Sequence, residues 1–174
     1  MTDVRPFPSS AELRGAPALL EPSAASPANG CRPVRDAAEL AEHLRIRRAV
    51  FVLEQGLFDG SDRDEHDDDP ATVHVLGFVD GLPAGTVRLY PLHDALWHGD
   101  RLAVLPEARR SRIGGRLVRL AVATAGQRGG SRMQARVQLP NVRFFVHLGW
   151  TPVAPPADHL GVPHQSMTIP LAAS

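Results

Sequence analysis

The chain has 174 residues, of which 43% are hydrophobic, which is enough for one domain with a substantial core. Its formal net charge is zero, so no overall field attracts nucleic acid or an anionic membrane, and neither is expected as a partner. Cys31 is the single cysteine and cannot form an intramolecular disulfide, which favours a reducing compartment. Because no apolar run approaches the length of a membrane span, we expect a soluble cytoplasmic protein.

Residues 1–30 contain five prolines, four serines and six alanines without an apolar period, which is typical of a disordered arm. One domain is expected over 31–174, beginning with a short strand at "CRPVR". A helix over 37–52 follows, with Asp36 as its N-terminal cap. Four residues at helical spacing are expected to form one face of this helix: Leu40, Leu44, Arg47 and Phe51.

A long polar loop, "EQGLFDGSDRDEHDDDP", follows the helix, and loops of this length inside a domain are usually functional or mobile. Between Glu54 and Asp69 it carries eight acids and one arginine. Such carboxylates could concentrate a cationic ligand, although a solvated loop is the simpler interpretation of the charge alone. A calcium loop is excluded because neither Asp59 nor Asp62 has glycine at the sixth position, and no paired cysteines or HExxH motif indicate zinc. We predict no metal.

Three strands are expected next, at "VHVLGFVD", "AGTVRLYPL" and "DRLAVL", with a short turn at residues 80–83 between the first two. A second helix starts at Ile113 and stops at the glycines 129–130. The strand "SRMQARVQ", a short helix "NVRFFVHLG" capped by Asn141, and closing strands at "WTPV" and "HQSMTIPL" complete the order. This order predicts an α/β sheet of mixed direction rather than a strictly alternating doubly wound fold.

A basic segment, "VLPEARRSRIGGRL", joins the strand to the second helix, and between Arg101 and Arg119 six arginines accompany one acid. The first amides of a helix lack partners within it, and the helix dipole adds positive charge, so a phosphate can bind there. Gly114 and Gly115 would let such a ligand approach the backbone. A P-loop is excluded because GKS or GKT is absent, and a dinucleotide fold because its glycine motif follows the first strand. On loop and charge alone, a solvated helix start is nearly as good an interpretation.

The spacing Arg109-x-x-Arg112-x-Gly114 after "VLPEA" resembles the acetyl-CoA loop of the GNAT N-acetyltransferases, with Arg112 at the family's first glycine position. "NVRFFVHLGW" resembles the family's asparagine and FYxxxGF block, with Phe145 at the usual tyrosine, and "GTVRL" resembles its third strand. "RRAVFVLEQG", "DDDPATVH", "QARVQ" and "LGVPHQSM" are similar to the ElaA-like branch. A bacterial nitrogen-starvation N-acetyltransferase subgroup is more similar still. The resemblance covers about residues 32–171.

This resemblance implies the α/β GNAT fold: a mixed, mostly antiparallel central sheet of about six to seven strands, with helices on both faces. Two parallel strands of that sheet would splay apart at the cofactor cleft. It also implies acetyl-CoA as the cofactor, a small-molecule primary amine as the acceptor and direct transfer in a ternary complex, and GNAT domains often form homodimers. The cofactor-binding residues that it implies are Leu102, Val104, Leu105, Arg109, Arg110, Arg112, Ile113, Gly114, Gly115, Asn141 and Phe144.

Acyl transfer to an amine requires a base, an oxyanion donor and a proton for the leaving thiolate. Glu54, at the end of the first helix, and His74, at the start of the next strand, are the candidates for the base, although each could instead be structural. The resemblance places the oxyanion donor at a backbone amide near Val104 or Leu105.

Because Phe145 cannot donate a proton, the general acid stays open between water, the amine itself, His147 and His164. His164 is also a candidate for substrate binding, as is Arg88, which could hold a carboxylate of the acceptor. Phe145 and Arg112 favour one alternative function, a catalytically silent acyl-CoA-binding module. A nucleic-acid binder ranks last, because the arginine segment lacks interleaved aromatic residues and the acidic loop would repel phosphates.

Overall fold

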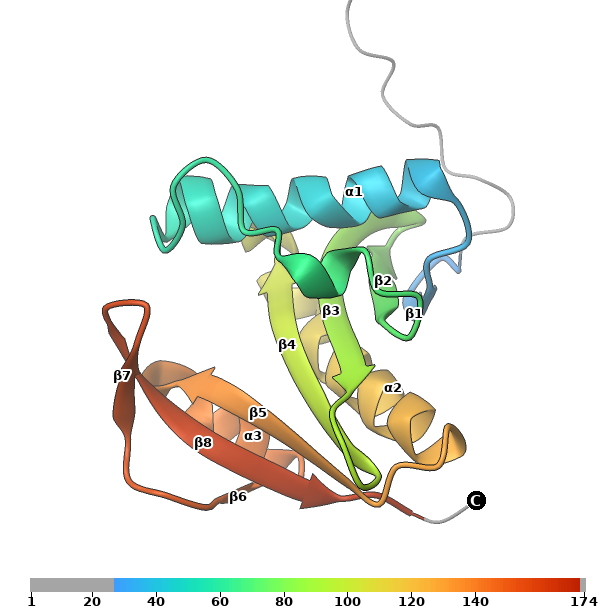
Figure 1. The fold of residues 1–174 in the computed structure, drawn as a ribbon. Coiled ribbons are helices and arrows are strands. Elements are labelled where there is room, and N and C mark those ends of the chain that lie inside the picture. The colour runs from blue at the N-terminus through green and yellow to red at the C-terminus, as the bar shows by residue number, and fades with distance from the viewer. Residues whose placement is uncertain (1–26, 173–174) are drawn as a thin grey trace, which may run out of the picture.

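The computed structural model describes residues 27–172, which form one mixed β-sheet with helices on both faces (Figure 1). Its eight strands are hydrogen-bonded in the order β1-β2-β3-β4-β5-β8-β6, and β7 also pairs with β8. All pairings are antiparallel except that of β4 with β5, which is parallel. The predicted arm lies outside the described residues, apart from residues 27–30.

The sheet has one or two strands more than the six to seven predicted, because the chain after α3 adds two very short strands along β8. The strands are β1 (Gly30–Pro33), β2 (Val73–Val79), β3 (Leu82–Pro91), β4 (Leu96–Val104), β5 (Arg132–Gln138), β6 (Thr151–Pro152), β7 (Ala157–His159) and β8 (Val162–Pro170). The turn predicted at residues 80–83 is tighter than expected. Asp80 and Gly81 alone form it, both with positive φ, as a two-residue hairpin between β2 and β3 requires.

The helices follow the predicted order, with short 3-10 turns between elements. They are α1 (Ala37–Arg47), α2 (Ile113–Gln127) and α3 (Val142–His147), the π-helix η1 (Arg48–Glu54), and the 3-10 turns η2 (Glu65–Asp67), η3 (Pro106–Ser111) and η4 (Leu139–Asn141). Asp36 caps α1 as predicted, accepting a hydrogen bond from the Glu39 amide at 2.9 Å. Among residues 27–172, no helix combines the length and apolarity needed to cross a bilayer.

The predicted first helix is continuous, but from Arg48 onward it is the π-helix η1. Arg47 and Phe51 are buried as predicted, whereas Leu40 and Leu44 are only half-buried. The buried face is instead made of His43, Ile46, Arg47, Val50 and Phe51.

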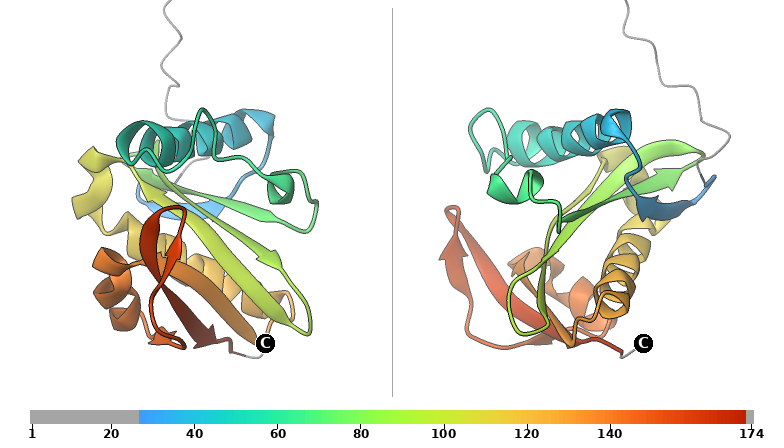
Figure 2. Two further views of the ribbon diagram at one scale, coloured as in Figure 1. Left: turned by 60° about the vertical axis from the view of Figure 1, so that its left-hand side comes forward. Right: turned by 45° about the vertical axis from the view of Figure 1, so that its right-hand side comes forward.

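Two apolar cores flank the sheet, because α1 covers one face and α2 with α3 the other (Figure 1, Figure 2). Glycines in the sheet determine how closely α2 approaches. A Cβ on Gly77 would lie 2.7 Å from Cγ1 of Ile113, and one on Gly85 would lie 2.9 Å from Cδ1 of Leu117. The first turn of α2 is therefore seated directly on β2 and β3, close to the end of β4.

Candidate active site

A cleft opens where the parallel strands β4 and β5 separate. The two strands pair over only three residues each, ending at His98 with Gln134, and β5 then continues with β8 as its partner. The space between them has a volume of about 340 Å³. This is the splayed parallel pair that the sequence predicts, and Leu102, Asn141 and His164 of the predicted site line it.

A β-bulge shapes the edge of β4 that faces the cleft. The pairing of β3 with β4 shifts between Thr86 and Arg88, so that Arg101 and Leu102 both lie opposite Val87. Arg101 has a φ of 52°, in the left-handed region that residues other than glycine rarely adopt. The bulge bends β4 away from β5 just where Leu102 enters the lining of the cleft.

Beyond the bulge, the N–H and C=O groups of successive β4 residues point alternately towards β3 and towards the open edge of the strand. The Leu105 amide donates to the Ala84 carbonyl at 2.9 Å, so the prediction that it serves as an oxyanion donor is wrong. Val104 points the other way, and its carbonyl accepts a hydrogen bond from Nε of Arg109 at 3.3 Å. Val104 therefore presents its backbone groups along the open edge of β4.

The acidic loop is held on the sheet by a buried ionic cluster, which comprises Arg47, Arg88, Arg101, Asp62, Asp64, Asp67 and Asp100. Arg47 of α1 is fully buried, and its guanidinium lies 2.7 Å from Asp62 and 2.5 Å from Asp67. Burial raises the pKa of Asp67, but the hydrogen bonds from Arg47 outweigh it and hold that pKa well below its usual range. The loop is thus fastened from beneath by arginines of α1 and of the sheet.

This cluster corrects two predictions. Arg88 is fully buried, with its guanidinium 2.5 Å from Asp64 and 2.7 Å from Asp100, so it offers no free cation to an acceptor carboxylate. The acidic loop is also less anionic than its sequence indicates, because arginines neutralise Asp62, Asp64 and Asp67. The expected concentration of a cationic acceptor by these three carboxylates is therefore not supported.

Neither predicted base lines the cleft. Both carboxylate oxygens of Glu54 accept hydrogen bonds from Nη2 of Arg109, at 2.7 and 2.6 Å. His74 lies on β2, which is separated from β4 by β3, and its ring meets that of His43 at a centroid distance of 5.0 Å. Burial lowers the pKa of His74, but the ring lies beside Asp67 rather than in the cleft. The two residues are neighbours of the site, not part of its lining.

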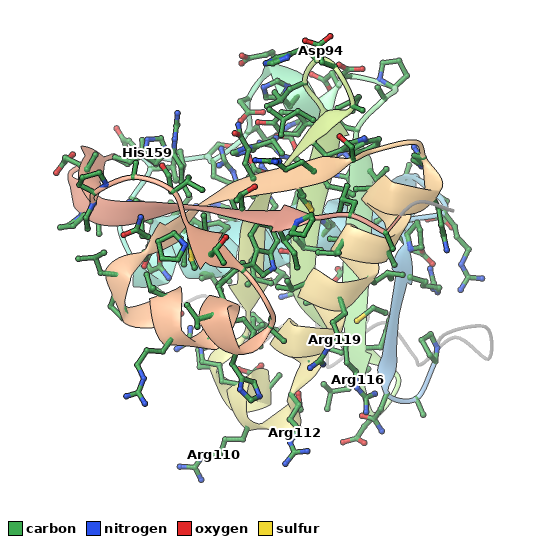
Figure 3. All side chains as sticks on the ribbon, turned by 90° about the horizontal axis from the view of Figure 1, so that it is seen from below. Asp94, Arg110, Arg112, Arg116, Arg119 and His159 are labelled. Atoms are coloured by element: carbon green, nitrogen blue, oxygen red, sulfur yellow. The ribbon has the colours of Figure 1, made fainter. Side chains whose placement is uncertain are left out.

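The basic segment lies at the end of β4, where η3 leads into α2. Arg112 adopts the left-handed conformation, with a φ of 64°, and turns the chain into the first helical residue, Ile113. Figure 3 shows Arg110 and Arg112 extending outward at this end of the molecule, with Arg116 and Arg119 farther along α2. Within residues 27–172, no ion pair engages any of these four side chains, although Arg116 donates to the Asn29 carbonyl at 2.6 Å. The start of α2 therefore combines helix amides with arginines that have no carboxylate partner.

Phe144 of α3 and Asn141 of η4 border the basic segment. A Cβ on Gly114 would lie 3.8 Å from Cζ of Phe144, and one on Gly115 would lie 4.0 Å from its Cε2. Asn141 occupies the predicted N-cap position of α3 and lines the cleft, but its side chain forms no capping hydrogen bond. The preceding turn η4 begins the helix instead, with the Val142 amide donating to the Leu139 carbonyl.

Comparison with known proteins identifies this architecture. The Acetyltransferase (GNAT) family matches residues 37–150, about two thirds of the chain. The chain belongs to the GNAT acetyltransferase family. A relative from Bacillus subtilis strain 168, the uncharacterized protein YyaT, is 28% identical over 133 residues, covering 75% of this chain and 88% of YyaT.

Solved structures of other proteins share the GNAT fold. A candidate N-acetyltransferase from Lactobacillus plantarum has a TM-score of 0.73 and 26% identity, covering 83% of this chain and 100% of that one. Escherichia coli ElaA has a TM-score of 0.72 and 22% identity, covering 80% and 98%. An aminoglycoside 6'-N-acetyltransferase complexed with coenzyme A has a TM-score of 0.68 and 15% identity, covering 83% and 98%. The last two show likeness of fold, and the nitrogen-starvation subgroup stays a prediction.

In this GNAT chain the polar wall of the cleft consists largely of residues that the sequence did not single out. His66 stacks on Tyr90 with ring centroids 3.8 Å apart, and Tyr90 lies 5.3 Å from His98. Burial raises the pKa of Tyr90 to about 12, so its phenol stays protonated at neutral pH. Across the cleft, His164 meets His159 at 5.2 Å. These rings come from η2, β3, β4, β7 and β8, and no local spacing links them.

His43, a buried histidine of α1, makes the free energy of unfolding of this GNAT chain depend on pH. Burial, with the neighbouring His74 and Arg47, lowers the pKa of His43 from 6.5 to about 3. Below pH 6.5 the unfolded chain therefore binds a proton at His43 that the folded chain does not. The free energy of unfolding should fall with pH from 6.5 towards 3, by up to about 1.4 kcal/mol per unit at this site.

Replacing His43 with leucine should reduce the slope of the free energy of unfolding against pH by the contribution of about one proton. Urea unfolding of both proteins between pH 5 and 7.5 measures the two slopes. His93→Leu is the matched control, because the His93 side chain is 72% exposed and the slope should not change. Equal slopes for wild type and His43→Leu would show that His43 is not the group responsible.

Proposed function

We propose that this chain is an N-acetyltransferase that uses acetyl-CoA and transfers the acetyl group directly to the primary amine of a small molecule in a ternary complex. The observation that supports this most strongly is the open edge of β4 inside the cleft, which leads through η3 to the first turn of α2. A cofactor with a phosphate end and an amide-bearing arm suits such an edge. The coenzyme A complex of the aminoglycoside 6'-N-acetyltransferase, which has this fold, is consistent with the proposal.

The start of α2 leaves room for a pyrophosphate. A Cβ on Gly114 would meet Cγ2 of Val104 at 3.6 Å and Cζ of Phe144 at 3.8 Å, both ordinary contacts, so packing does not require glycine here. Close approach of a ligand to the amides of residues 110–115 does explain it. Arg110 and Arg112 would add charge-assisted contacts.

The remaining predicted residues would hold the pantetheine arm and the acyl group. Leu102 and Val104 lie on the open edge of β4, and Asn141 and Phe144 border it from η4 and α3. When bound, acetyl-CoA would supply an acyl group activated as a thioester. Arg109 would have to exchange its contact with Glu54 to reach a phosphate, so we assign it a secondary role.

We assign the removal of a proton from the amine to His98 instead of Glu54 or His74. His98 is the last residue of β4 paired with β5, so it lies at the closed end of the cleft, four residues before Leu102. Burial lowers the pKa of His98, against an opposing effect of Asp100, which leaves the imidazole neutral at pH 7. A neutral imidazole there can accept a proton from an alkylammonium or from a water molecule beside it.

One observation favours the second candidate, an acyl-CoA-binding module without turnover. Phe145 occupies the position of the family's usual tyrosine, and its ring is buried against Trp150 at a centroid distance of 5.4 Å. It cannot protonate a leaving thiolate. Release of CoA with any member of a panel of polyamines, amino acids and amino sugars would establish the enzyme, whereas acetyl-CoA binding without release would favour the module.

Binding of acetyl-CoA by the full chain tests the cofactor site, and Gly114→Asp should weaken it by roughly 10–100-fold. The added carboxylate would repel the pyrophosphate, yet an acid in the first turn of a helix stabilises it by about 0.3–1 kcal/mol. The affinity for acetyl-CoA measured by titration calorimetry should therefore fall, while the midpoint of thermal unfolding should rise.

Gly114→Asn, which has the same size without the charge, separates the steric from the electrostatic part and should cost less affinity. Wild-type protein that does not bind acetyl-CoA would contradict the proposed function. Undiminished binding by Gly114→Asp would contradict this placement of the pyrophosphate.

A further inference from the structure

The acceptor side of the cleft holds a cation without a carboxylate partner. Arg136 lies on β5, lines the cleft and is exposed, and no ion pair engages it among residues 27–172. Of the three acids that line the cleft, Asp64 and Asp100 are already paired with Arg88, and no ion pair joins the third, Glu65, to Arg136. This side of the cleft is therefore more cationic than the acidic loop alone predicts.

Strand alternation aims Arg136 into the cleft. Met133, Ala135 and Val137 are buried in the core that β5 forms with α2, so Arg136 projects from the opposite face. On that face its neighbour across β8 is Ser166, which brings no charge. The guanidinium thus extends over an uncharged part of the sheet.

The charge of Arg136 reaches both walls of the cleft. Burial and then Arg136 lower the pKa of His159 on β7. On β4, burial lowers the pKa of His98, Asp100 opposes this, and Arg136 lowers it further. Arg136 is therefore near both histidines, and all three residues line the same cleft.

We propose that Arg136 binds a carboxylate of the acceptor, so that the substrates are amino acids and related amines that carry a carboxylate near the amine. This inference rests on the proposed function and supplies the substrate class. A planar guanidinium with five donors matches a carboxylate in two parallel hydrogen bonds. Arg136 takes the role that the sequence predicted for Arg88, because Arg88 is paired with carboxylates of the ionic cluster.

The distance between Arg136 and His98 suits such an acceptor. His98 pairs with Gln134, and Arg136 follows two residues later on the same face, about 7 Å along the strand. The arginine side chain can cover much of that distance. An amine at His98 and a carboxylate at Arg136 would then be separated by only a few bonds.

The test compares acceptors that differ only in the carboxylate. Phenylalanine, methionine and glycine are each assayed beside the corresponding primary amide, with the full chain and acetyl-CoA, by release of CoA. We expect Arg136→Gln to lower kcat/KM for the acids by roughly 10–100-fold, because a charged hydrogen bond is lost, and to leave the amides within about twofold. Since each acceptor is compared between two proteins, the different basicity of acids and amides cancels.

Arg132→Gln is the matched control. Arg132 is an exposed arginine on the same strand and the same face, about 13 Å away, and it does not line the cleft. Arg132→Gln should leave kcat/KM unchanged for both the acids and the amides. Arg136→Lys, which keeps the charge but not the planar fork, should recover part of the activity on acids.

Three results would overturn the assignment of Arg136. These are an equal loss of kcat/KM on acids and amides in Arg136→Gln, no loss on the acids, and acetyl-CoA binding without acetylation of any acid. In all three the acetyl-CoA part of the proposed function would stand. Calorimetry that detects no acetyl-CoA binding would instead refute the proposed function itself, so the two failures are distinguishable.

Discussion

His98→Gln is expected to lower kcat by about 10²–10⁴-fold with little change in acetyl-CoA affinity, because glutamine retains the polarity and cannot act as the base. The wild-type kcat/KM should rise with pH through the pKa of His98, which burial places below 6.5. The variant should lose this rise. Steady-state kinetics between pH 5 and 9, with calorimetry of acetyl-CoA binding, measure both effects.

Glu54→Gln and His74→Gln provide the comparison, since local sequence pointed to them as bases. The structure places neither in the lining of the cleft, so each should reduce kcat far less than His98→Gln. His93→Gln, on the exposed turn between β3 and β4, controls for the loss of a histidine. A larger loss for Glu54→Gln than for His98→Gln would return the role to the carboxylate and refute our assignment.

Arg47→Leu should cost about 3–5 kcal/mol of unfolding free energy, the largest stability effect that we expect from one substitution. It leaves the buried carboxylates of Asp62 and Asp67 without their main counter-ion. For a domain of this size the midpoint of thermal unfolding should fall by roughly 10 °C. Calorimetric unfolding at pH 7 measures the change.

Arg45→Leu, on the same helix, is the control for this substitution. Arg45 is 54% exposed and pairs with Glu42 on the surface, where an ion pair contributes at most about 1 kcal/mol. A similar small cost for both substitutions would mean that the cluster around Arg47 contributes no more than a surface pair. Because Arg47 holds the loop that carries His66, its loss should also disturb the cleft.

Local sequence was sufficient for the fold class and for the strand-to-helix segment that we propose binds the cofactor. Arg109 to Gly115 are contiguous, so their spacing and the strand-to-helix transition are visible without knowing where other segments lie. Asp36 could be recognised as a cap for the same reason, because a cap acts on amides three residues away. The order of the elements followed from periodicity and turn residues, and the splayed pair followed from the resemblance, which depends on several such local motifs.

The polar wall of the cleft could not be found in this way, because strand register decides which side chains face the cleft. His74 and His98 are both histidines in β-strands, yet β3 separates the strand of His74 from β4, whereas His98 lies at the point where β4 leaves β5. The stacking of His66 on Tyr90 joins residues 24 positions apart. Nothing in the spacing of these residues indicates that contact.

Charge shows the same division most clearly. The residues alone reveal one acidic segment, one basic segment and an arginine-flanked helix start, since these depend on composition and on neighbours in the chain. Which charges are free is settled by folding, because Coulomb energy depends on distance in space. Arg88 meets Asp64 at 2.5 Å across 24 residues, which neutralises its charge, whereas no ion pair within residues 27–172 engages Arg136, which we propose binds a ligand.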